Sequence, residues 1–192
     1  MAAATEAAGP VIRFEAGVGS VEGRRIVRLP TEASAQLPSR GQVAVEGTLD
    51  GRDFTGVLEP DGLRGHWLDI DRPSALAPNP ADSSTPSPSN ATVSVVLTPT
   101  KAWPEPEVPA DLRAALDAAP SSAATWADIT PMARWEWVRW ITATRSPSTR
   151  DRRIEVGISK LDRGSRRPCC FDLSSCTDPD LSRSGKLLLP SH

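Results

Sequence analysis

Arginine, tryptophan and cysteine are concentrated between Trp126 and Cys176, a segment that makes up about a quarter of the 192-residue chain. It contains four of the six tryptophans, ten of the 22 lysines and arginines, and all three cysteines. A guanidinium presents a planar set of N–H donors that matches a phosphate or a carboxylate, and an indole ring stacks on bases and apolar groups. These residue types indicate recognition of an anion more than they indicate a bond-breaking site.

Arginines and one tryptophan of this segment form the predicted ligand-binding set. The set is Arg150, Arg153, Arg166, Arg167, Trp137 and Arg139. Arg150 and Arg153 are three positions apart and are therefore neighbours on a helix. Cations near a helix N-terminus oppose the helix dipole, so these two do not serve to stabilise their own helix. The alternative is a solvated face whose arginines form ion pairs with the acidic first domain.

The tryptophans allow two interpretations. Trp135 and Trp137 are two positions apart on a predicted helix, which places their side chains about 200° apart around its axis. At least one indole must therefore face a second surface. Either both surfaces are buried, as aromatic side chains commonly are, or one indole is exposed between Arg134 and Arg139 and stacks on a ligand.

Two adjacent cysteines, Cys169 and Cys170, are candidate reactive thiols because they follow two arginines, and nearby guanidiniums favour the thiolate. The alternative is a pair of buried or idle thiols. The three clustered cysteines lack the second ligand pair of a zinc site, so we predict no metal and no cofactor. His66 lies on the opposite strand face from Asp69, which favours a structural histidine over a catalytic His–Asp pair.

The charge of the chain is unevenly distributed. Residues 134–167 contain ten basic and four acidic residues, a net charge of +6, which leaves −8 for the rest because the whole chain carries −2. Such an asymmetry attracts anions. The odd number of cysteines does not suit a secreted disulfide framework, the N-terminus is unlike a signal peptide, and no stretch is long enough to span a bilayer. We therefore expect a cytoplasmic protein.

Alternating apolar residues predict short strands through the first half of the chain. The strongest local signal is Asp50-Gly51 between the apolar runs 43–49 and 54–58, because a type I′ hairpin turn requires positive φ at both central residues. Residues 63–70 and 92–98 read as further strands. Closely spaced short strands with turn residues between them predict a small antiparallel β-barrel or sandwich, of which we favour the barrel.

Beyond Pro109 the apolar period becomes helical, and three helices are predicted. They run over residues 110–118, from an N-cap at Thr130 to about Ala143, and from a cap at Ser148 or Thr149 to a stop at Gly164. The predicted fold class is therefore α+β, with a small antiparallel β-barrel followed by a three-helix C-terminal unit.

These patterns divide the chain into five parts. They are a disordered N-terminus (1–10), a small β-barrel domain (11–98) with a Pro/Ser-rich flexible insertion (73–90), a Pro-rich linker (99–109), a helical domain (110–171) and a polar, loose tail (172–192). The insertion lies inside the barrel domain because strand character returns after it.

Several motifs resemble a known family. They are Val108-Pro109-Ala110-Asp111-Leu112, Trp135-Glu136-Trp137-Val138-Arg139-Trp140-Ile141, and Thr149-Arg150-Asp151-Arg152-Arg153-Ile154 leading to Gly164-Ser165-Arg166-Arg167. Through them the helical half resembles the YdeI/OmpD-associated (bacteriocin-protection-like) family. Through Leu29-Pro30 and Val45-Glu46-Gly47-Thr48-Leu49-Asp50-Gly51, the first half is similar to the small β-barrel domain of unknown function that often precedes it. The resemblance implies roles in stress or antimicrobial-peptide resistance, and it implies no catalytic residues.

Two function classes follow from these observations. The first is a non-enzymatic cytoplasmic binding or stress-protection protein, whose Trp/Arg helical surface contacts an anionic small molecule, peptide or nucleic acid. The second is a small enzyme with its site in a cleft between barrel and helices, which uses arginines for substrate charge and, in one version, a cysteine thiol. Fast and selective alkylation of Cys169 or Cys170 at neutral pH would favour the enzyme.

Overall fold

The computed structural model describes residues 9–71, 91–168 and 172–189. The chain divides into two compact units, which we call the barrel unit and the helical unit. The barrel unit comprises Met1–Pro104, Leu173–Cys176 and Gly185–His192, and the helical unit comprises Glu105–Asp172 and Thr177–Ser184. The division after Pro104 falls within the segment predicted as a linker. The predicted insertion and nearly all of the predicted disordered N-terminus lie outside the described residues.

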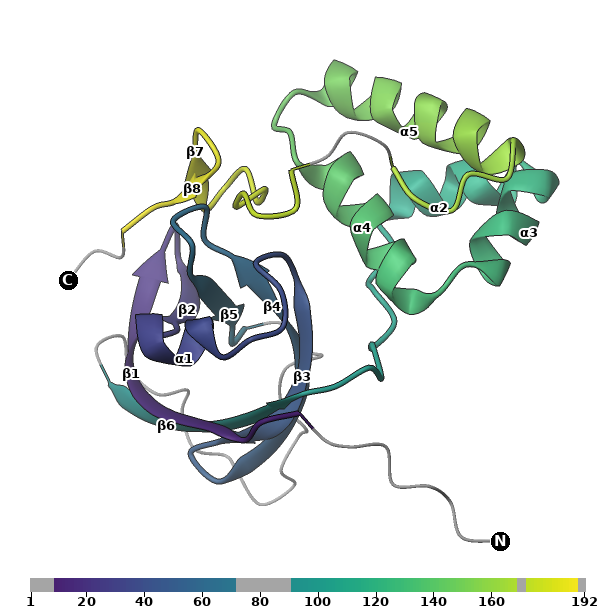
Figure 1. The fold of residues 1–192 in the computed structure, drawn as a ribbon. Coiled ribbons are helices and arrows are strands. Elements are labelled where there is room, and N and C mark those ends of the chain that lie inside the picture. The colour runs from purple at the N-terminus through teal and green to yellow at the C-terminus, as the bar shows by residue number, and fades with distance from the viewer. Residues whose placement is uncertain (1–8, 72–90, 169–171, 190–192) are drawn as a thin grey trace, which may run out of the picture. The chain divides into compact units, whose positions relative to one another are not determined.

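Within the described residues, antiparallel strands close into a six-stranded barrel in the order β1-β2-β5-β4-β3-β6, as Figure 1 shows. Their bounds are β1 Ile12–Val21, β2 Arg24–Arg28, β3 Val43–Leu49, β4 Arg52–Pro60, β5 His66–Asp69 and β6 Thr92–Pro99. Closure gives each strand two neighbours and removes the open edges that a sheet would expose. The structure confirms the predicted α+β class with an antiparallel barrel.

Alternation of apolar and polar residues fills the barrel with apolar side chains. In β1, Ile12 is buried and Arg13 is exposed, and in β6 Val93, Val95 and Leu97 are buried. These residues belong to one continuous apolar core inside the barrel. A period of two along each strand therefore decides which side chains the barrel encloses.

Tight turns join consecutive strands. Asp50 and Gly51 have φ values of 49° and 76°, so the hairpin between β3 and β4 has the positive φ at both positions that the sequence predicts. A second turn of this kind, at Glu22 and Gly23 with φ values of 49° and 79°, joins β1 and β2 and was not predicted. Glu-Gly is a weaker turn signal than Asp-Gly, because a glutamate side chain does not favour positive φ.

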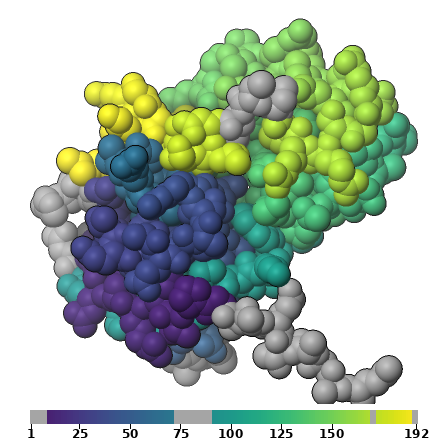
Figure 2. Space-filling view, in the orientation of Figure 1, coloured from purple at the N-terminus to yellow at the C-terminus, as the bar shows by residue number. Residues whose placement is uncertain are grey.

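A short helix that the sequence pattern did not predict, α1 (Thr31–Ala35), covers one end of the barrel. Ala33 and the following Leu37 are buried and belong to the barrel core. Figure 1 shows α1 across the opening of the barrel, and in Figure 2 the dark blue segment that contains it covers the barrel end facing the viewer. The helix escaped prediction because five residues are too few to show a helical period.

The helical unit contains four helices among its described residues, where the sequence predicts three. They are α2 Ala110–Asp117, α3 Pro120–Asp128, α4 Pro131–Thr142 and α5 Pro147–Asp162. The helix predicted over residues 110–118 ends at Asp117, and Pro120 then begins α3, which was not predicted, because a proline in the first turn loses no intrahelical hydrogen bond. The predicted N-cap Thr130 is confirmed, since its Oγ1 accepts a hydrogen bond from Ala133 N at 3.3 Å.

The last helix, α5, begins slightly earlier than predicted. Its N-cap is Ser146, not Ser148 or Thr149, and the Ser146 hydroxyl accepts a hydrogen bond from the Thr149 main chain at 3.3 Å. The predicted stop at Gly164 is consistent with its φ of 79°, a conformation that glycine adopts without strain. Ile154 and Leu161 face the core of the helical unit, with Leu112, Trp137 and Ile141.

The C-terminal segment is more ordered than the loose tail expected from its polar composition. β7 (Ser182–Arg183) and β8 (Lys186–Leu187) form a small two-stranded sheet around a turn with positive φ at Ser184 and Gly185. Cys176, Leu181 and Leu187 are buried. A few apolar residues and a tight turn are enough to order this segment, although its overall composition is polar.

Candidate anion-binding surface

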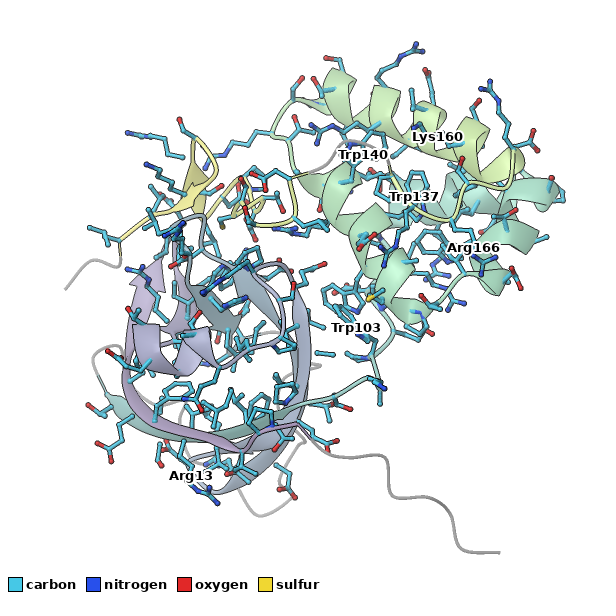
Figure 3. All side chains as sticks on the ribbon, viewed as in Figure 1. Arg13, Trp103, Trp137, Trp140, Lys160 and Arg166 are labelled. Atoms are coloured by element: carbon cyan, nitrogen blue, oxygen red, sulfur yellow. The ribbon has the colours of Figure 1, made fainter. Side chains whose placement is uncertain are left out.

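The indole of Trp137 lies in the core of the helical unit. Its surface is 0% exposed, and its ring packs edge-to-face against Trp140 with the ring centroids 5.9 Å apart. Figure 3 shows both rings between α4 and α5. Trp137 Nε1 donates a hydrogen bond to the main-chain oxygen of Arg166 at 3.3 Å. Trp137 is therefore buried, as in the interpretation that assigns the indoles to the core.

Arg139 and Arg167 lie near the same carboxylate on α4. Arg139 is only 5% exposed, and Glu136, one turn earlier, is also buried. Burial raises the pKa of the Glu136 carboxyl, and the positive charges of Arg167 and Arg139 oppose this increase. Arg167 Nε lies 3.3 Å from Glu136 Oε2. Arg139 and Arg167 therefore lie near one carboxylate of the protein itself, that of Glu136.

Arg150 is bonded to a carboxylate at the start of α2. Its Nε and Nη2 donate to Asp111 Oδ2 and Oδ1 at 2.5 Å and 3.0 Å. These hydrogen bonds lower the pKa of the Asp111 carboxyl, and the same interaction raises the pKa of Arg150. An external anion would have to displace Asp111 to use the guanidinium fork of Arg150.

Arg153 and Arg166 are held by different partners again. Arg153 Nη1 donates to the Trp140 main-chain oxygen at 2.8 Å, and its guanidinium lies 5.7 Å from the Trp140 ring centroid. Arg166 donates to Asp128 Oδ2 at 2.5 Å and to Asp128 O at 3.0 Å. The five arginines of the predicted set therefore lie against several different groups of the protein itself. Ligand binding by the predicted set stays a prediction.

A different set of cations lines a shallow depression of about 310 Å³ on the outer side of α5, which we call the basic face of α5. Its residues are Arg152, Glu155, Val156, Ser159, Lys160 and Arg163. Three of them are cationic and one is acidic. Arg152 Nη1 lies 3.0 Å from Glu155 Oε2, but these side chains are 74% and 67% exposed. Such an exposed ion pair contributes little stability, so water or a ligand replaces it readily.

The predicted site omitted this face because Arg152 points away from Arg150 and Arg153. The signal that would have found it is the helical spacing of its members. Starting from Arg152 they follow at i+3, i+4, i+7, i+8 and i+11, which places them on one side of a helix.

Cys169 and Cys170 lie outside the described residues, and Cys176 is buried. Within residues 9–71, 91–168 and 172–189, no group of three or more His, Cys, Asp and Glu side chains is placed to hold a metal ion. The thiol-dependent enzyme therefore stays a prediction.

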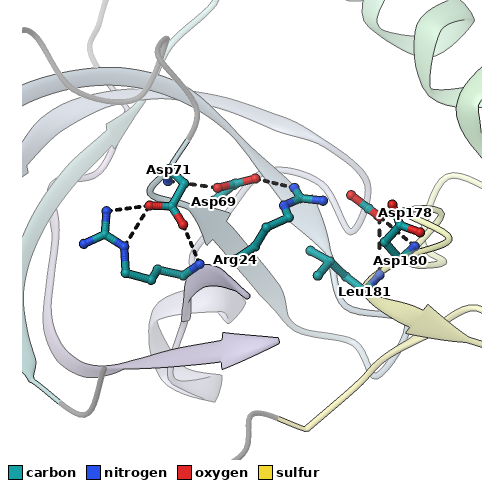
Figure 4. Close-up of polar contacts among 7 residues, drawn as sticks. Arg24, Asp69, Asp71, Asp178, Asp180 and Leu181 are labelled. Atoms are coloured by element: carbon teal, nitrogen blue, oxygen red, sulfur yellow. Dashed lines mark hydrogen bonds and ion pairs between the residues drawn. The ribbon is translucent and has the colours of Figure 1, made fainter. Parts of the chain in front are cut away.

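The polar contacts of the barrel unit join neighbouring strands. Asp69 pairs with Arg24, and Asp71 accepts hydrogen bonds from the Arg25 main-chain nitrogen at 2.6 Å and from Arg25 Nε at 2.7 Å, as Figure 4 shows. Burial acts to raise the pKa of the Asp71 carboxyl, but the hydrogen bonds from Arg25 hold it below its ordinary value. These contacts tie the end of β5 to β2.

A second depression, of about 450 Å³, lies at the rim of the barrel. Its walls include Gln36 and Pro38 after α1, Glu46 in β3 and residues 98–102 at and after the end of β6. Apolar atoms of the prolines and Ala102 contribute to it together with one acid and one base. We refer to it as the rim pocket.

Comparison with family models agrees with the two-unit division. Residues 105–164 match the family described as bacteriocin-protection, YdeI or OmpD-associated. Residues 14–74 match a family described as a domain of unknown function (DUF1905). Both matches confirm the resemblance predicted from the sequence. No curated protein and no solved structure shows a significant match to the chain.

The YdeI/OmpD-associated match spans all four helices of the helical unit. It includes Arg150, Arg153 and the whole basic face of α5, and it ends before Arg166 and Arg167. The barrel match runs from β1 through β5 and includes α1. The two matched families therefore correspond to separate parts of the fold.

Proposed function

We propose that the protein is a non-enzymatic binding protein that holds an anionic ligand on the basic face of α5. The observation that carries this proposal is the depression on that face, which is lined by three cations, Arg152, Lys160 and Arg163, and by one acid, Glu155. A ligand phosphate or carboxylate there would receive charge-assisted hydrogen bonds, which are stronger than those between neutral groups.

The bonding of the other arginines supports this choice of surface. Displacing Arg150 would break its hydrogen bonds with Asp111, and displacing Arg167 would remove one of the two cations near the buried Glu136. Leaving a buried charge uncompensated is costly. At the basic face, the exposed Arg152–Glu155 pair is worth about 0–1 kcal/mol, so a ligand that displaces it loses little. Arg152 is therefore easier to recruit to a ligand than Arg150 or Arg167.

The geometry of the face favours an extended ligand. Arg152 and Arg163 are separated by about 16 Å along the helix axis, from the helical rise per residue. The Ser159 hydroxyl lies between them on the same side of the helix. No aromatic residue lines the depression, so base stacking does not contribute. The ligand class that fits is a chain of phosphate or carboxylate groups recognised by charge and spacing.

The cellular role proposed for this binding comes from the family description, which names bacteriocin protection. Protection against a bacteriocin or a related stress is the role that we extend to this chain. In the described part of the chain, no helix combines the length and apolar character needed to cross a membrane. A cytoplasmic location stays a prediction that rests on the sequence.

The test uses two double variants that remove the same charge from different surfaces. Arg152→Ala with Arg163→Ala changes the basic face, and Arg113→Ala with Arg145→Ala changes exposed positions elsewhere in the helical unit. Fluorescence anisotropy would follow binding of a labelled single-stranded oligonucleotide and of labelled inorganic polyphosphate, at salt concentrations from about 50 to about 200 mM.

We expect the wild-type protein to bind both polyanions with an affinity that falls as salt rises. The basic-face variant should bind roughly tenfold more weakly. Its affinity should also depend less steeply on salt, because fewer phosphate contacts release fewer counterions on binding. The control variant should bind as the wild type does. Equal losses in both variants would show that net charge acts without this face, and absence of wild-type binding would reject the proposal.

A further inference from the structure

One buried imidazole connects three segments at the end of the barrel. His66, the first residue of β5, is 0% exposed. Its Nδ1 lies 2.7 Å from the Ser34 hydroxyl in α1, and its Nε2 lies 2.9 Å from the Gly41 main-chain oxygen, just before β3. The ring therefore joins β5 to both ends of the segment that covers the barrel.

The partners of His66 assign its protonation state. A carbonyl oxygen only accepts hydrogen bonds, so Nε2 carries the proton and donates to Gly41. Nδ1 then accepts from the Ser34 hydroxyl. A second proton on Nδ1 would face the Ser34 oxygen, so the hydroxyl would have to reverse its role. Protonation would also place a positive charge where no water reaches it.

The charged groups near His66 compensate that charge only in part. The buried carboxylate of Asp61 favours the protonated ring, and Arg40 opposes it. Asp61 already accepts hydrogen bonds from the Leu63 and Gly65 main chains at 2.7 Å and 2.8 Å, and from Arg28 at 3.1 Å. Burial, as the largest effect, lowers the pKa of His66 below its ordinary value.

The segment held by His66 has little stability of its own. α1 has five residues and no side-chain hydrogen bond at its N-cap, and so short a helix is not stable in isolation. The segment is anchored by the Ser34 hydrogen bond, by burial of Ala33 and Leu37 against the barrel core, and by a hydrogen bond from Arg40 Nη1 to Arg64 O at 3.0 Å. The same segment supplies Gln36 and Pro38 to the rim pocket. Release of α1 would remove one wall of that pocket.

We infer that His66 is a proton-operated latch, and that protonation of its ring releases α1 and the chain through Gly41 from the end of the barrel, which opens the rim pocket. This device belongs to the barrel unit and does not depend on anion binding by α5. The segment opens when the hydrogen bond between His66 and Ser34 is lost, because the charged ring is more stable in contact with water than when buried. Neutral conditions restore the hydrogen bond and close the segment.

Hydrogen exchange of the full-length protein tests the latch. Exchange rates, corrected for the intrinsic effect of pH, would be measured for residues 31–42 from about pH 7.5 to about pH 5, the range in which histidine titrates. We expect these amides to exchange roughly tenfold faster at the acidic end, because the opening equilibrium shifts with the protonation of one group. Amides of the β3–β4 hairpin and of α5 should not follow this change.

Variants separate the latch from a general effect of acid. His66→Gln replaces the imidazole with an amide, which has a hydrogen-bond donor and an acceptor but does not titrate. Amide exchange in residues 31–42 should therefore no longer become faster in acid. Ser34→Ala removes the hydroxyl partner, so α1 should already exchange faster at neutral pH. Glu32→Gln, an exposed acid of the same helix, is the matched control and should behave as the wild type does.

An NMR titration of the His66 ring in the wild-type protein completes the test without any substitution. Its midpoint should coincide with the midpoint of the exchange response in residues 31–42. The inference is overturned if His66 titrates while those residues keep their protection, or if a folded His66→Gln protein retains the same acid response.

Discussion

The barrel unit and the helical unit are stabilised by different kinds of interaction. In the barrel, main-chain hydrogen bonds run from strand to strand until the sheet closes, and apolar side chains fill the interior. In the helical unit, short helices share a smaller apolar core, and arginine side chains bind carboxylates and main-chain oxygens on neighbouring segments. The barrel should therefore be sensitive to changes at its backbone, and the helical unit to loss of particular side chains.

The largest expected effect follows from adding one methyl group to the barrel. A Cβ atom at Gly47 in β3 would lie 1.9 Å from Val96 O and 2.8 Å from Leu97 Cα in β6, and backbone atoms cannot move aside as a flexible side chain does. Gly47→Ala should destabilise the barrel by roughly 3 kcal/mol, the upper part of the range for overpacking. Hydrogen-exchange protection of β3 and β6 would measure this loss.

A second glycine of the same barrel provides the control. A Cβ atom at Gly17 in β1 would meet nothing within 4 Å. Gly17→Ala should therefore change stability by no more than about 0.5 kcal/mol, as surface substitutions usually do. Similar losses for both variants would mean that strand glycines matter for their flexibility and not for the close approach of β3 to β6.

The next largest effect concerns an arginine of the helical unit. Arg134 donates to the main-chain oxygens of Trp126, Ala127 and Ile129 at 3.0, 2.9 and 3.0 Å, and it also binds Glu105. Arg134→Ala should destabilise the unit by roughly 2–3 kcal/mol, because several acceptors lose a charged donor. Urea unfolding followed by far-UV circular dichroism would measure the change.

Two further arginine substitutions sharpen this result. Arg134→Lys keeps the charge but loses the planar fork, so it should recover only part of the lost stability. Arg152→Ala removes an arginine whose partner Glu155 is equally exposed, and it should cost less than about 0.5 kcal/mol. If Arg152→Ala cost as much as Arg134→Ala, charge and not specific hydrogen bonding would hold the helices.

Features of the fold that depend on near neighbours in sequence could be predicted. The Asp50-Gly51 turn, the Thr130 cap and the Gly164 stop each depend on the conformation of a few consecutive residues. The apolar alternation of the first half predicted a barrel, and the motifs of both halves predicted the two families that match. The helix α1 and the role of Pro120 were missed because the local pattern is compatible with more than one structure.

The candidate site was harder to predict because the partners of its arginines are distant in sequence. Arg134, Arg150 and Arg166 bind carboxylates that lie 29, 39 and 38 positions earlier in the chain. A count of arginines and acids within one segment does not contain these pairings. It predicted either an exposed basic surface or ion pairs with the acidic first domain, whereas folding brings acids from α2, α3 and the preceding linker to several of these arginines.

Acid should weaken the barrel unit at a higher pH than the helical unit. Burial lowers the pKa of His66 from its ordinary value of 6.5, so its contribution to stability is complete above that value and is lost as pH falls through the folded pKa. Hydrogen bonds from Arg150 lower the pKa of Asp111 from 3.8, so that contribution is lost only below 3.8. Burial raises the pKa of Glu136 from 4.5, so its protonation on acidification favours the folded state.

Hydrogen exchange resolved by unit would check this order. As pH falls below about 6.5, the ordinary pKa of histidine, protection should decrease in the barrel first. Protection of α2 and α5 should persist until the carboxylates titrate. Simultaneous loss in both units would mean that one cooperative transition overrides these separate groups, and His66→Gln should then leave the transition unchanged.

The smallest expected effect is a gain in stability, the opposite of the loss expected for Gly47→Ala. A Cβ atom at Gly157 in α5 would lie 3.7 Å from side-chain atoms of Ile141 and Trp137, an ordinary packing distance. Gly157→Ala should therefore stabilise the helical unit by about 0.5–1 kcal/mol, because alanine loses less backbone entropy in a helix. Gly164→Ala is the control and should destabilise by about 1 kcal/mol, since its φ of 79° suits glycine. Destabilisation by Gly157→Ala would show that α4 and α5 tolerate an added methyl group no better than the strands do.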